Sequence, residues 1–239
     1  MKTLIAVVAY NEEKSIQATI KDLGARDSGY DVAVIDNGSS DATVRLSAAM
    51  GVPVVNHCIN TGGSAGVLTT YFLYAHKMGY DCLCQFDGDG QHLAAELPKI
   101  LGPVHRGEAD YVIGSRFLAK EGSQSTALRR VGIRLFSQLD SAIMGQRITD
   151  VTSGFRAYSR RVIEFFARSY RYELHDTNQL LLASHFSGAR VLEVPVLMRE
   201  RLHGQSEFDL TNAIVYPFLG VVNIAGVWLQ HGNIRRKGN

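Results

Sequence analysis

Short apolar runs alternate with helical patterns along the first half of the chain, and this rhythm constrains the fold more than any other feature. The apolar runs have strand length and cover residues 4–9, 32–35, 52–55 and 82–86. A helical segment follows each run and ends at a glycine, the fourth of them over residues 93–101 before Gly102 and Pro103. Strands and helices that alternate in this way predict an α/β fold whose mostly parallel sheet carries helices on both faces.

Acidic residues stand where these strands are predicted to end. Asp36 follows the second run, and Asp87 and Asp89 follow the fourth, with Gln91 and His92 directly after them. Open α/β sheets bind ligands at the carboxyl ends of their strands. Carboxylate oxygens on a glycine-containing turn suit a divalent cation that carries phosphate oxygens. Asp and Gly are also ordinary turn residues, so the turn by itself leaves both interpretations open.

A glycine-rich segment, Asn60 to Gly66, opens the helix after the third run. Backbone N–H groups in such a loop can cradle phosphate, which makes Gly62 a candidate contact. The segment lacks the lysine of a P-loop and does not match the dinucleotide fingerprint, so it is a weak signal alone.

The composition is that of an ordinary globular protein, with 46% apolar and 20% charged residues among 239. The formal net charge of +2 gives no reason to expect a nucleic-acid partner. The three cysteines cannot all pair within the chain, and Cys82 and Cys84 would share one face of a strand. We therefore expect reduced core thiols and a cytoplasmic protein. The first apolar run is short and no small-residue cleavage site follows it, so no signal peptide is expected.

The second half of the chain is rich in arginine. An apolar helical stripe over residues 128–142 carries Arg129, Arg130 and Arg134 on its other side, and residues 199–206 form a basic loop. These arginines either form a solvated face or bind an anion.

The tail has an apolar stretch over residues 214–229 and then Arg235, Arg236 and Lys237. This stretch is shorter than the ~20 residues that span a bilayer. It suits an anionic membrane surface, and equally a helix packed on the protein's own core or on a partner subunit.

Five segments in this order resemble the family 2 glycosyltransferases, which bind nucleotide sugars on the GT-A fold. The segments are Ala9–Glu13 (AYNEE), Ile35–Asp41 (IDNGSSD), Asp87–His92 (DGDGQH), Gly114–Phe117 (GSRF) and Arg201–Ser206 (RLHGQS). The turn and the last loop are most similar to the polyprenyl-phosphate sugar synthases, of the dolichyl-phosphate mannose synthase type. Two positions depart from the pattern: Asn37 stands where many members carry Asp, and Glu207 stands where Lys is frequent.

The resemblance implies a Rossmann-like, mostly parallel sheet with its metal and nucleotide site at the strand carboxyl ends. It implies one GT-A domain over residues 1–206, with a nucleotide-sugar half (1–117) and an acceptor half (118–206), followed by the tail (207–239). Residues expected to bind the nucleotide sugar are Ala9, Tyr10, Glu12, Asp36, Asn37, Gly62 and Asp87. Asp87, Asp89 and Gln91 are expected to bind Mg²⁺ or Mn²⁺, with Asp87 nearer the ribose and sugar.

The expected acceptor determines which residues of the second half act. A polyprenyl phosphate is already ionised, and Arg116, Arg130 and Arg201 are expected to hold it. A sugar hydroxyl would instead need a base, for which Asp176 is the candidate, although an acid before a helix also fits that position.

Three functions remain as hypotheses. The first is a metal-dependent inverting glycosyltransferase that moves sugar from a nucleotide diphosphate sugar to a polyprenyl phosphate. It would work peripherally on the inner, cytosolic membrane face, with the membrane surface or a small membrane protein as partner, and a homodimer remains open. The second is a sugar-to-sugar transferase that builds polysaccharide or glycolipid on a glycan acceptor. The third is a non-catalytic nucleotide-sugar-binding protein.

Overall fold

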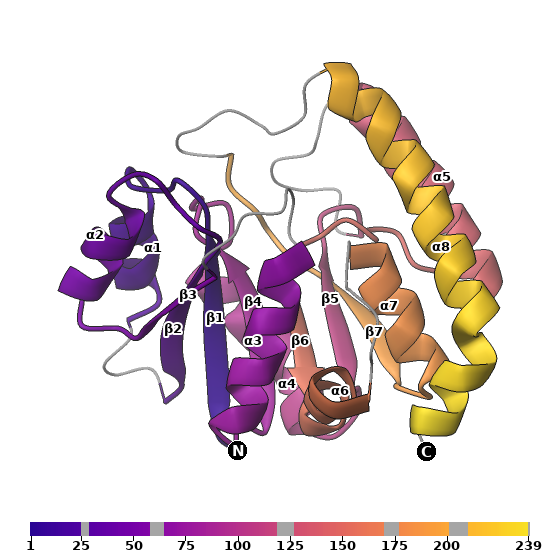
Figure 1. Cartoon of the computed structure of the whole chain (residues 1–239), viewed down its shortest axis with the longest axis horizontal. Coiled ribbons are helices and arrows are strands. Elements are labelled where there is room, and N and C mark those ends of the chain that lie inside the picture. Colours follow the sequence, from indigo (N-terminus) through magenta and orange to yellow (C-terminus); the bar gives the residue numbers. More distant parts are fainter. Residues whose placement is uncertain (25–28, 58–64, 119–126, 170–176, 201–209, 239) are drawn as a thin grey trace.

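A seven-stranded sheet forms the centre of the computed structural model, which describes residues 1–24, 29–57, 65–118, 127–169, 177–200 and 210–238 (Figure 1). The strand order is β3-β2-β1-β4-β6-β5-β7. The strands are β1 (Thr3–Ala9), β2 (Asp31–Asp36), β3 (Val54–Asn56), β4 (Cys82–Asp87), β5 (Tyr111–Ser115), β6 (Arg156–Ser159) and β7 (Val191–Pro195). All pairings are parallel except those of β6, which lies antiparallel between β4 and β5. The prediction of a mostly parallel α/β sheet is confirmed.

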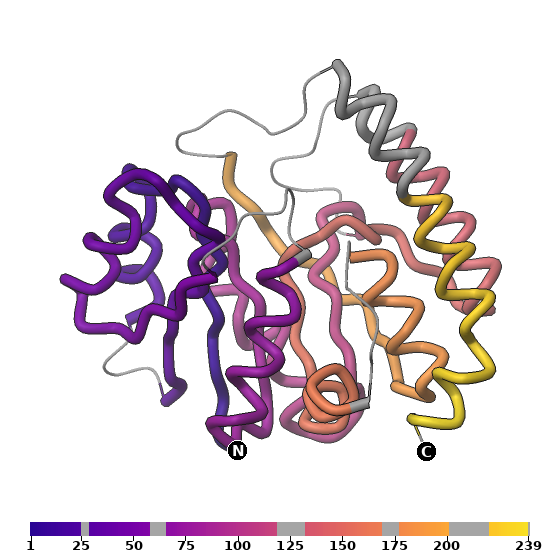
Figure 2. Tube along the Cα trace, viewed as in Figure 1, coloured from indigo at the N-terminus to yellow at the C-terminus, as the bar shows by residue number. Residues whose placement is uncertain are grey.

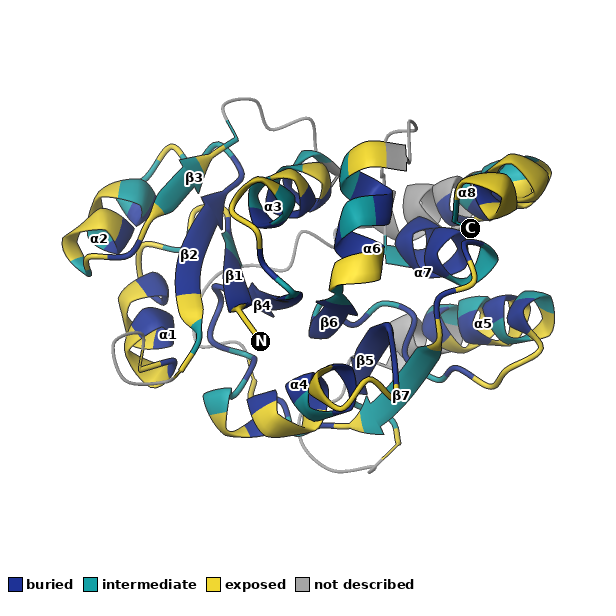
Figure 3. Ribbon diagram, turned by 90° about the horizontal axis from the view of Figure 1, so that it is seen from below, coloured by how far each residue is buried: buried dark blue, intermediate teal, exposed yellow. Residues whose placement is uncertain are grey.

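Helices cover both faces of this sheet, as Figure 3 shows from below. The helices are α1 (Ile16–Asp22), α2 (Thr43–Ala49), α3 (Ala65–Lys77), α4 (Leu97–His105), α5 (Ala127–Met144), α6 (Arg160–Glu164), α7 (Thr177–Phe186) and α8 (Leu210–Gly238). A 3₁₀ turn (Ala94–Glu96) precedes α4, and a π-helical turn (Phe165–Ser169) continues α6. Helices α3, α6 and α7 lie on one face, and α1 and α4 lie on the other.

Two apolar clusters, one on each face, hold these layers together. Leu4 and Ala6 of β1 face the cluster of α3 and α7, whereas Ile5 and Val7 face the cluster of α1 and α4. The alternation follows from the period of two in a strand, and strands buried on both faces read as continuous apolar runs. Cys82 and Cys84 are free and buried in the second cluster, and burial raises the pKa of the Cys82 thiol to about 12.

Two details of the chain differ from the predictions. Helix α4 does not end before Gly102 and Pro103 but continues to His105, and Gly107 with φ of +67° follows its end. The proline removes one backbone donor, but it is itself buried and Val104 behind it continues the apolar face, so packing outweighs that loss. Strand β6 was not predicted, because its four residues include Arg156 and two other polar side chains rather than an apolar run.

The tail forms a long helix that packs along α7, with α5 beside it (Figure 1). Ile224, Val227 and Ile234 of α8 are buried on that side. Within the described residues, none of the helices combines the length and the apolar character that a membrane crossing requires. Figure 2 shows that the N-terminal segments lie toward the β3 end of the strand order and the C-terminal segments toward the β7 end.

Candidate functional site

The carboxyl ends of β1, β2 and β4 meet at one edge of the sheet, uppermost in Figure 1. In the register of the strands, Ala9 pairs with Asp36 on one side, and Val8 pairs with Asp87 on the other. The polar residues predicted from three separate motifs are therefore neighbours. We call this region, with Ala9–Glu12, Asp36–Asn37 and Asp87–Gln91, the acidic edge.

The turns after β1 and β2 are hydrogen-bonded to each other. The Asn37 N–H donates to the Ala9 carbonyl at 2.9 Å, and Asn11 Oδ1 accepts from the Ser40 N–H at 2.9 Å. Asn11 itself has a φ of +53°, a conformation that asparagine tolerates better than most residues. Tyr10 next to it is 39% exposed, so its ring is open to a ligand at the edge.

Glu12 is tied into the same pair of turns. Its backbone N–H donates to Thr43 Oγ1 at 2.8 Å, and its carboxylate accepts from Ser15 Oγ at 2.5 Å. Asp41 lies on the other side of the junction. Its burial opposes ionisation, but hydrogen bonds from Thr43 and Glu13 hold the pKa of Asp41 below its usual value. These contacts give the β1 and β2 turns a fixed shape without a ligand.

Asp36 is fully buried at the end of β2. Its Oδ2 accepts from the N–H groups of Gly38 and Ser39, at 3.0 and 2.9 Å. Its Oδ1 is also buried, but it has no hydrogen-bond partner among the described residues. A buried carboxylate oxygen without a partner is costly, and a hydroxyl or N–H of a bound ligand would relieve that cost.

The turn after β4 presents the two carboxylates of the DGDGQH motif. The Gly88 N–H donates to the Val8 carbonyl at 2.8 Å, which fixes the turn to β1. Asp89 is buried, and its Oδ1 accepts from the Gln91 N–H at 3.0 Å. The Asp87 side chain is 34% exposed and lies 3.5 Å from His92 Nε2.

A second turn closes around Asp87 from the side of β6. A Cβ atom on Gly154 would lie 2.6 Å from Asp87 Oδ2, so the carboxylate occupies space that only a glycine leaves open. Phe155, the next residue, stacks on the His92 ring with a centroid separation of 4.6 Å and an interplanar angle of 15°. Gly154 was not predicted as a site residue, although residues 152–156 have the composition of a turn.

The oxygen donors of this turn fit a divalent cation that is shared with a ligand. No group of three or more His, Cys, Asp or Glu side chains among the described residues is placed to hold a metal by itself. Mg²⁺ and similar ions are often bound by one or two carboxylates together with substrate phosphates and water. Asp87 and Asp89 supply such carboxylates from one turn, and Gln91 follows two residues later in the chain.

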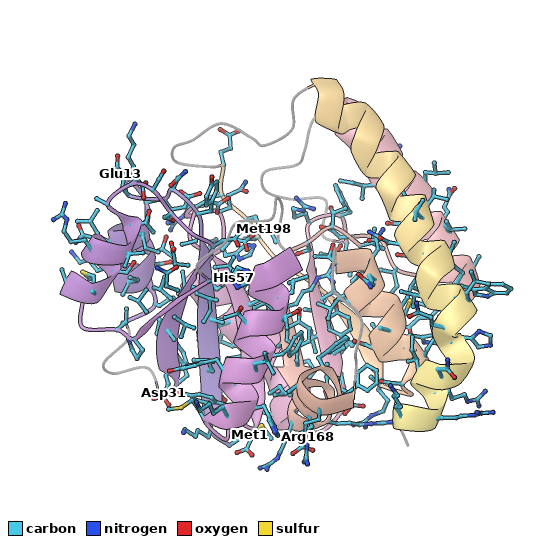
Figure 4. The ribbon with its side chains drawn as sticks, in the orientation of Figure 1. Met1, Glu13, Asp31, His57, Arg168 and Met198 are labelled. Carbon is cyan, nitrogen blue, oxygen red and sulfur yellow. The ribbon has the colours of Figure 1, made fainter. Side chains whose placement is uncertain are left out.

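The Gln91 and His92 segment also contacts the chain that leads into the basic loop. The Arg199 N–H donates to the Gln91 carbonyl at 2.9 Å, and the backbones of His92 and Met198 form an isolated antiparallel β-bridge. Figure 4 labels Met198 and His57 close to this edge. His57 follows β3 and contacts Thr70 Oγ1 at 3.0 Å, with its ring seated where Gly66 has no side chain. In the sequence, only the position of His57 after a strand could have marked it as a residue near the site.

Arg116 lies at the end of β5, but the protein itself supplies it with acceptors. Its Nε and Nη2 donate to the two oxygens of Asp150, each at 2.7 Å, and Nη2 also donates to Thr152 Oγ1. Glu193 of β7 fixes the same turn by accepting from the Thr149 and Asp150 N–H groups. Burial raises the pKa of Glu193 above its usual value in spite of these bonds. We call these residues the Arg116 network.

Behind this network lies a fully buried arginine. Arg156 donates to the carbonyls of Ser153, Val151 and Thr177 and to the Tyr111 hydroxyl. It therefore ties the turn that carries Asp150 to the first residue of α7. In the sequence Arg156 is one more arginine of the arginine-rich second half, whereas in the structure its guanidinium is inside the core.

The other predicted site residues cannot be located in the same way. Gly62, Asp176 and Arg201 lie outside the described residues, and of Arg130 only the backbone, in α5, is described. Their roles remain predictions.

Comparisons with known proteins agree with this architecture. Residues 4–166 match the family described as Glycosyl transferase family 2. The undecaprenyl-phosphate mannosyltransferase of Micrococcus luteus is 31% identical over 221 residues, which cover 87% of this chain and 88% of that protein. The polyprenol monophosphomannose synthase of Mycolicibacterium smegmatis is 28% identical over 223 residues, covering 88% and 82%.

A solved structure shows the same fold. Glucosyl-3-phosphoglycerate synthase from Mycobacterium tuberculosis, in complex with Mn²⁺, uridine diphosphate and phosphoglyceric acid, superimposes with a TM-score of 0.70. The match covers 94% of this chain and 78% of that one, at 17% sequence identity. The GT-A fold implied by the resemblance is confirmed, and the chain belongs to glycosyl transferase family 2.

Proposed function

We propose that this protein transfers a sugar from a nucleotide diphosphate sugar to a polyprenyl phosphate, with inversion at the anomeric carbon and with a divalent cation. The observation that carries the proposal is the acidic edge. There the unsatisfied Oδ1 of the buried Asp36 and the Asp87–Asp89 turn flank the end of β1. A nucleoside offers hydroxyl and N–H donors, and a diphosphate offers oxygens for a cation, so one ligand would satisfy both groups.

Within this proposal each residue of the edge has a part. Asp36 accepts a hydrogen bond from the nucleoside, and the exposed ring of Tyr10 packs against it. Ala9, Glu12 and Asn37 shape the walls, and Asp87 lies toward the ribose and sugar. Asp87, Asp89 and Gln91 would hold Mg²⁺ or Mn²⁺, which would neutralise the charge that develops on the leaving diphosphate.

The acceptor class rests on the relatives and on the chemistry of the nucleophile. By their names, the relative from Micrococcus luteus transfers mannose to undecaprenyl phosphate, and the relative from Mycolicibacterium smegmatis forms polyprenol monophosphomannose. A phosphate oxygen needs no strong base, and its attack on the face opposite the leaving diphosphate inverts the anomeric centre. Arg130 and Arg201 are the residues proposed to hold this phosphate, with Asp176 as the base if the acceptor is instead a hydroxyl.

Exposed apolar side chains support a location at a membrane surface, which we propose to be the cytosolic face. Opposite its buried side, α8 exposes Val221, Val222, Trp228 and Leu229, and its end carries Arg235, Arg236 and Lys237. Leu135 and Leu139 of the neighbouring α5 are exposed as well. A helix with an apolar face, a tryptophan and a basic end suits the headgroup region of an anionic bilayer.

The test of function is a transfer assay with purified protein, polyprenyl phosphate and a panel of radiolabelled nucleotide sugars. We expect label in the organic-soluble lipid with one donor and no transfer in excess chelator. Label that enters only a water-soluble glycan would favour the sugar-to-sugar transferase. Binding of a donor without any turnover would favour a binding protein.

Variants then separate the two acceptor chemistries. For a phosphate acceptor, Arg201→Ala and Arg130→Ala should raise the acceptor KM, each lost contact being worth about 1.5–3 kcal/mol, while Asp176→Asn has little effect. For a hydroxyl acceptor, Asp176→Asn should cost about 10² to 10⁴ in rate. Arg147→Ala is the matched control. Arg147 is exposed, and its neighbour Gln146 bonds the Val191 carbonyl at the opposite edge of the sheet.

Membrane binding is tested with point variants rather than by truncation, because removal of α8 would uncover α7. Replacement of both Trp228 and Leu229 by serine should reduce cosedimentation with anionic vesicles. Leu73→Ser, which changes a similarly exposed leucine on α3, should not. Equal sedimentation of both variants would show that the exposed face of α8 does not bind the membrane.

A further inference from the structure

We propose that His92 is a positioning residue that sets the orientation of the Asp87 carboxylate through a neutral imidazole protonated on Nε2. This inference rests on the proposed function only in assigning Asp87 to the ligand site. The geometry that carries it lies in the fold itself.

Both ring nitrogens of His92 face the same residue. The Asp87 backbone N–H donates to Nδ1 at 2.9 Å, and Nε2 lies 3.5 Å from Asp87 Oδ2. A nitrogen that accepts a hydrogen bond cannot itself carry a proton, so the proton of the neutral ring is on Nε2. The N–H of Nε2 then points toward the carboxylate. Its distance is longer than that of a well-formed hydrogen bond, so the ring acts as an oriented dipole.

The ring itself has little freedom to turn. The His92 side chain is 3% exposed. Phe155 stacks on one face at 4.6 Å, and Phe86 meets it edge-on at 5.2 Å with an interplanar angle of 87°. The backbone bridge to Met198 holds the residue from the other direction. Rotation of the imidazole would break both the stack and the bond from the Asp87 N–H.

The turn that supplies the stack also limits the carboxylate. Phe155 holds the ring, and Gly154 beside it leaves the space that Asp87 Oδ2 occupies. The carboxylate is therefore confined between the imidazole N–H and the Gly154 backbone. Because the carboxylate cannot rotate freely, the position of its other oxygen, Oδ1, is fixed as well. Packing alone would explain a buried aromatic ring, but it would not explain why both polar atoms of that ring face Asp87.

Three substitutions separate these contributions. His92→Phe keeps the aromatic stack and loses both nitrogens. His92→Gln places an amide N–H where Nε2 was, so it can reach the carboxylate. His92→Asn offers an acceptor to the Asp87 N–H but is too short to reach Oδ2. His105→Phe is the control, since His105 contacts Thr3 Oγ1 at the start of β1, far along the strand from the turn.

The first readout is the binding of Mn²⁺ in the presence of inorganic pyrophosphate. It is measured as the decrease of the electron paramagnetic resonance signal of free Mn²⁺. We expect His92→Phe to weaken binding by about 10- to 100-fold, as is usual when a partner behind a metal ligand is removed. His92→Gln should recover most of the affinity, His92→Asn should not, and His105→Phe should match the unchanged protein. If His92→Phe does not fold, the comparison of the Gln and Asn variants still decides.

The second readout is the ¹⁵N spectrum of the histidine rings at neutral pH in metal-free protein, with His92 assigned by its absence from the Gln variant. The proposal requires the signature of an unprotonated Nδ1 and a protonated Nε2. The opposite tautomer, or equal Mn²⁺ affinity in the Gln, Asn and Phe variants, would overturn it. If these results hold but no sugar reaches a lipid phosphate, the proposed function fails and the role of His92 stands.

Discussion

The acidic edge and the Arg116 network lie at the carboxyl ends of neighbouring parts of one sheet, but they treat their charges in opposite ways. At the acidic edge, backbone N–H groups hold one oxygen of Asp36 and one of Asp89, while Oδ1 of Asp36 has no partner among the described residues. In the Arg116 network the guanidinium is matched by both oxygens of Asp150.

The difference indicates what each region is prepared to do. The acidic edge has a fixed shape and a charge that a cation or a hydrogen-bond donor can still satisfy. In the Arg116 network the positive charge of Arg116 is paired with the carboxylate of Asp150. Its main effect is therefore to fix the shape of the turn at Asp150. A phosphate acceptor would then depend on cations outside this pair, and Arg201 remains the leading candidate.

The largest expected effect tests whether the Arg116 network is structural. Asp150 is fully buried, so Asp150→Asn leaves the Arg116 charge without its partner and should lower the free energy of unfolding by about 3–5 kcal/mol. Urea denaturation measures this loss. Glu108→Gln, which breaks the exposed pair with Arg106, should leave the midpoint unchanged. Unchanged stability together with tighter acceptor binding would instead make Arg116 a phosphate ligand.

The acidic edge should respond in activity rather than in stability. Asp89→Asn should reduce turnover by about 10² to 10³ or more, because it removes charge stabilisation in the transition state. Its melting temperature should stay close to that of the unchanged protein, measured by calorimetry. Asp81→Asn, at the opposite edge of the sheet, is the control for loss of a carboxylate. A collapsed Asp89 variant would show that this carboxylate supports the fold.

A smaller effect is expected where the two regions meet, at Gly154. A methyl group at this position would collide with Asp87 Oδ2, so Gly154→Ala should displace the carboxylate and lower donor turnover by about 10- to 100-fold. Gly132→Ala in α5, where no described atom lies within 4 Å of the added methyl group, is the matched control and should keep full activity. Full activity in both variants would mean that the position of Asp87 is not critical.

The smallest effect concerns an ion pair remote from both regions. Burial alone would raise the pKa of Asp110, but hydrogen bonds from Arg190 and Ser159 hold it below its usual value. A carboxyl whose pKa is lower in the folded state contributes stability that is complete above its unfolded pKa of about 3.9 and is lost as the pH falls through the folded value. The stability difference from Asp110→Asn should therefore be constant near neutrality and shrink in acid, as followed by urea midpoints. A difference that grows in acid would contradict the assignment.

Local sequence patterns were enough to predict the parallel strands and the acidic residues that end them. Runs such as residues 4–9 are apolar on both faces, which only a doubly covered strand requires. The carboxyl ends of parallel strands share an edge, so the positions of Asp36 and Asp87 in the sequence were enough to place them together.

Long-range compensation could not be predicted in this way. Arg156 appears in the sequence as a free cation beside a turn, yet the fold buries it because three carbonyls and a tyrosine hydroxyl converge on it. The same holds for Arg116, since its partner Asp150 lies 34 residues further along the chain. Helix α4 passes through Pro103 because buried contacts around it outweigh one missing hydrogen bond.

Both ends of the described chain emerge at the same edge of the sheet, opposite the acidic edge (Figure 1). Met1 is exposed there, and the Gly238 carbonyl accepts a hydrogen bond from Arg161 at 3.2 Å. A tether attached at either end would therefore leave the strand carboxyl ends facing away from the support. The molecule could be immobilised on a sensor chip, or joined to a reporter domain, with its binding surface presented to the solution.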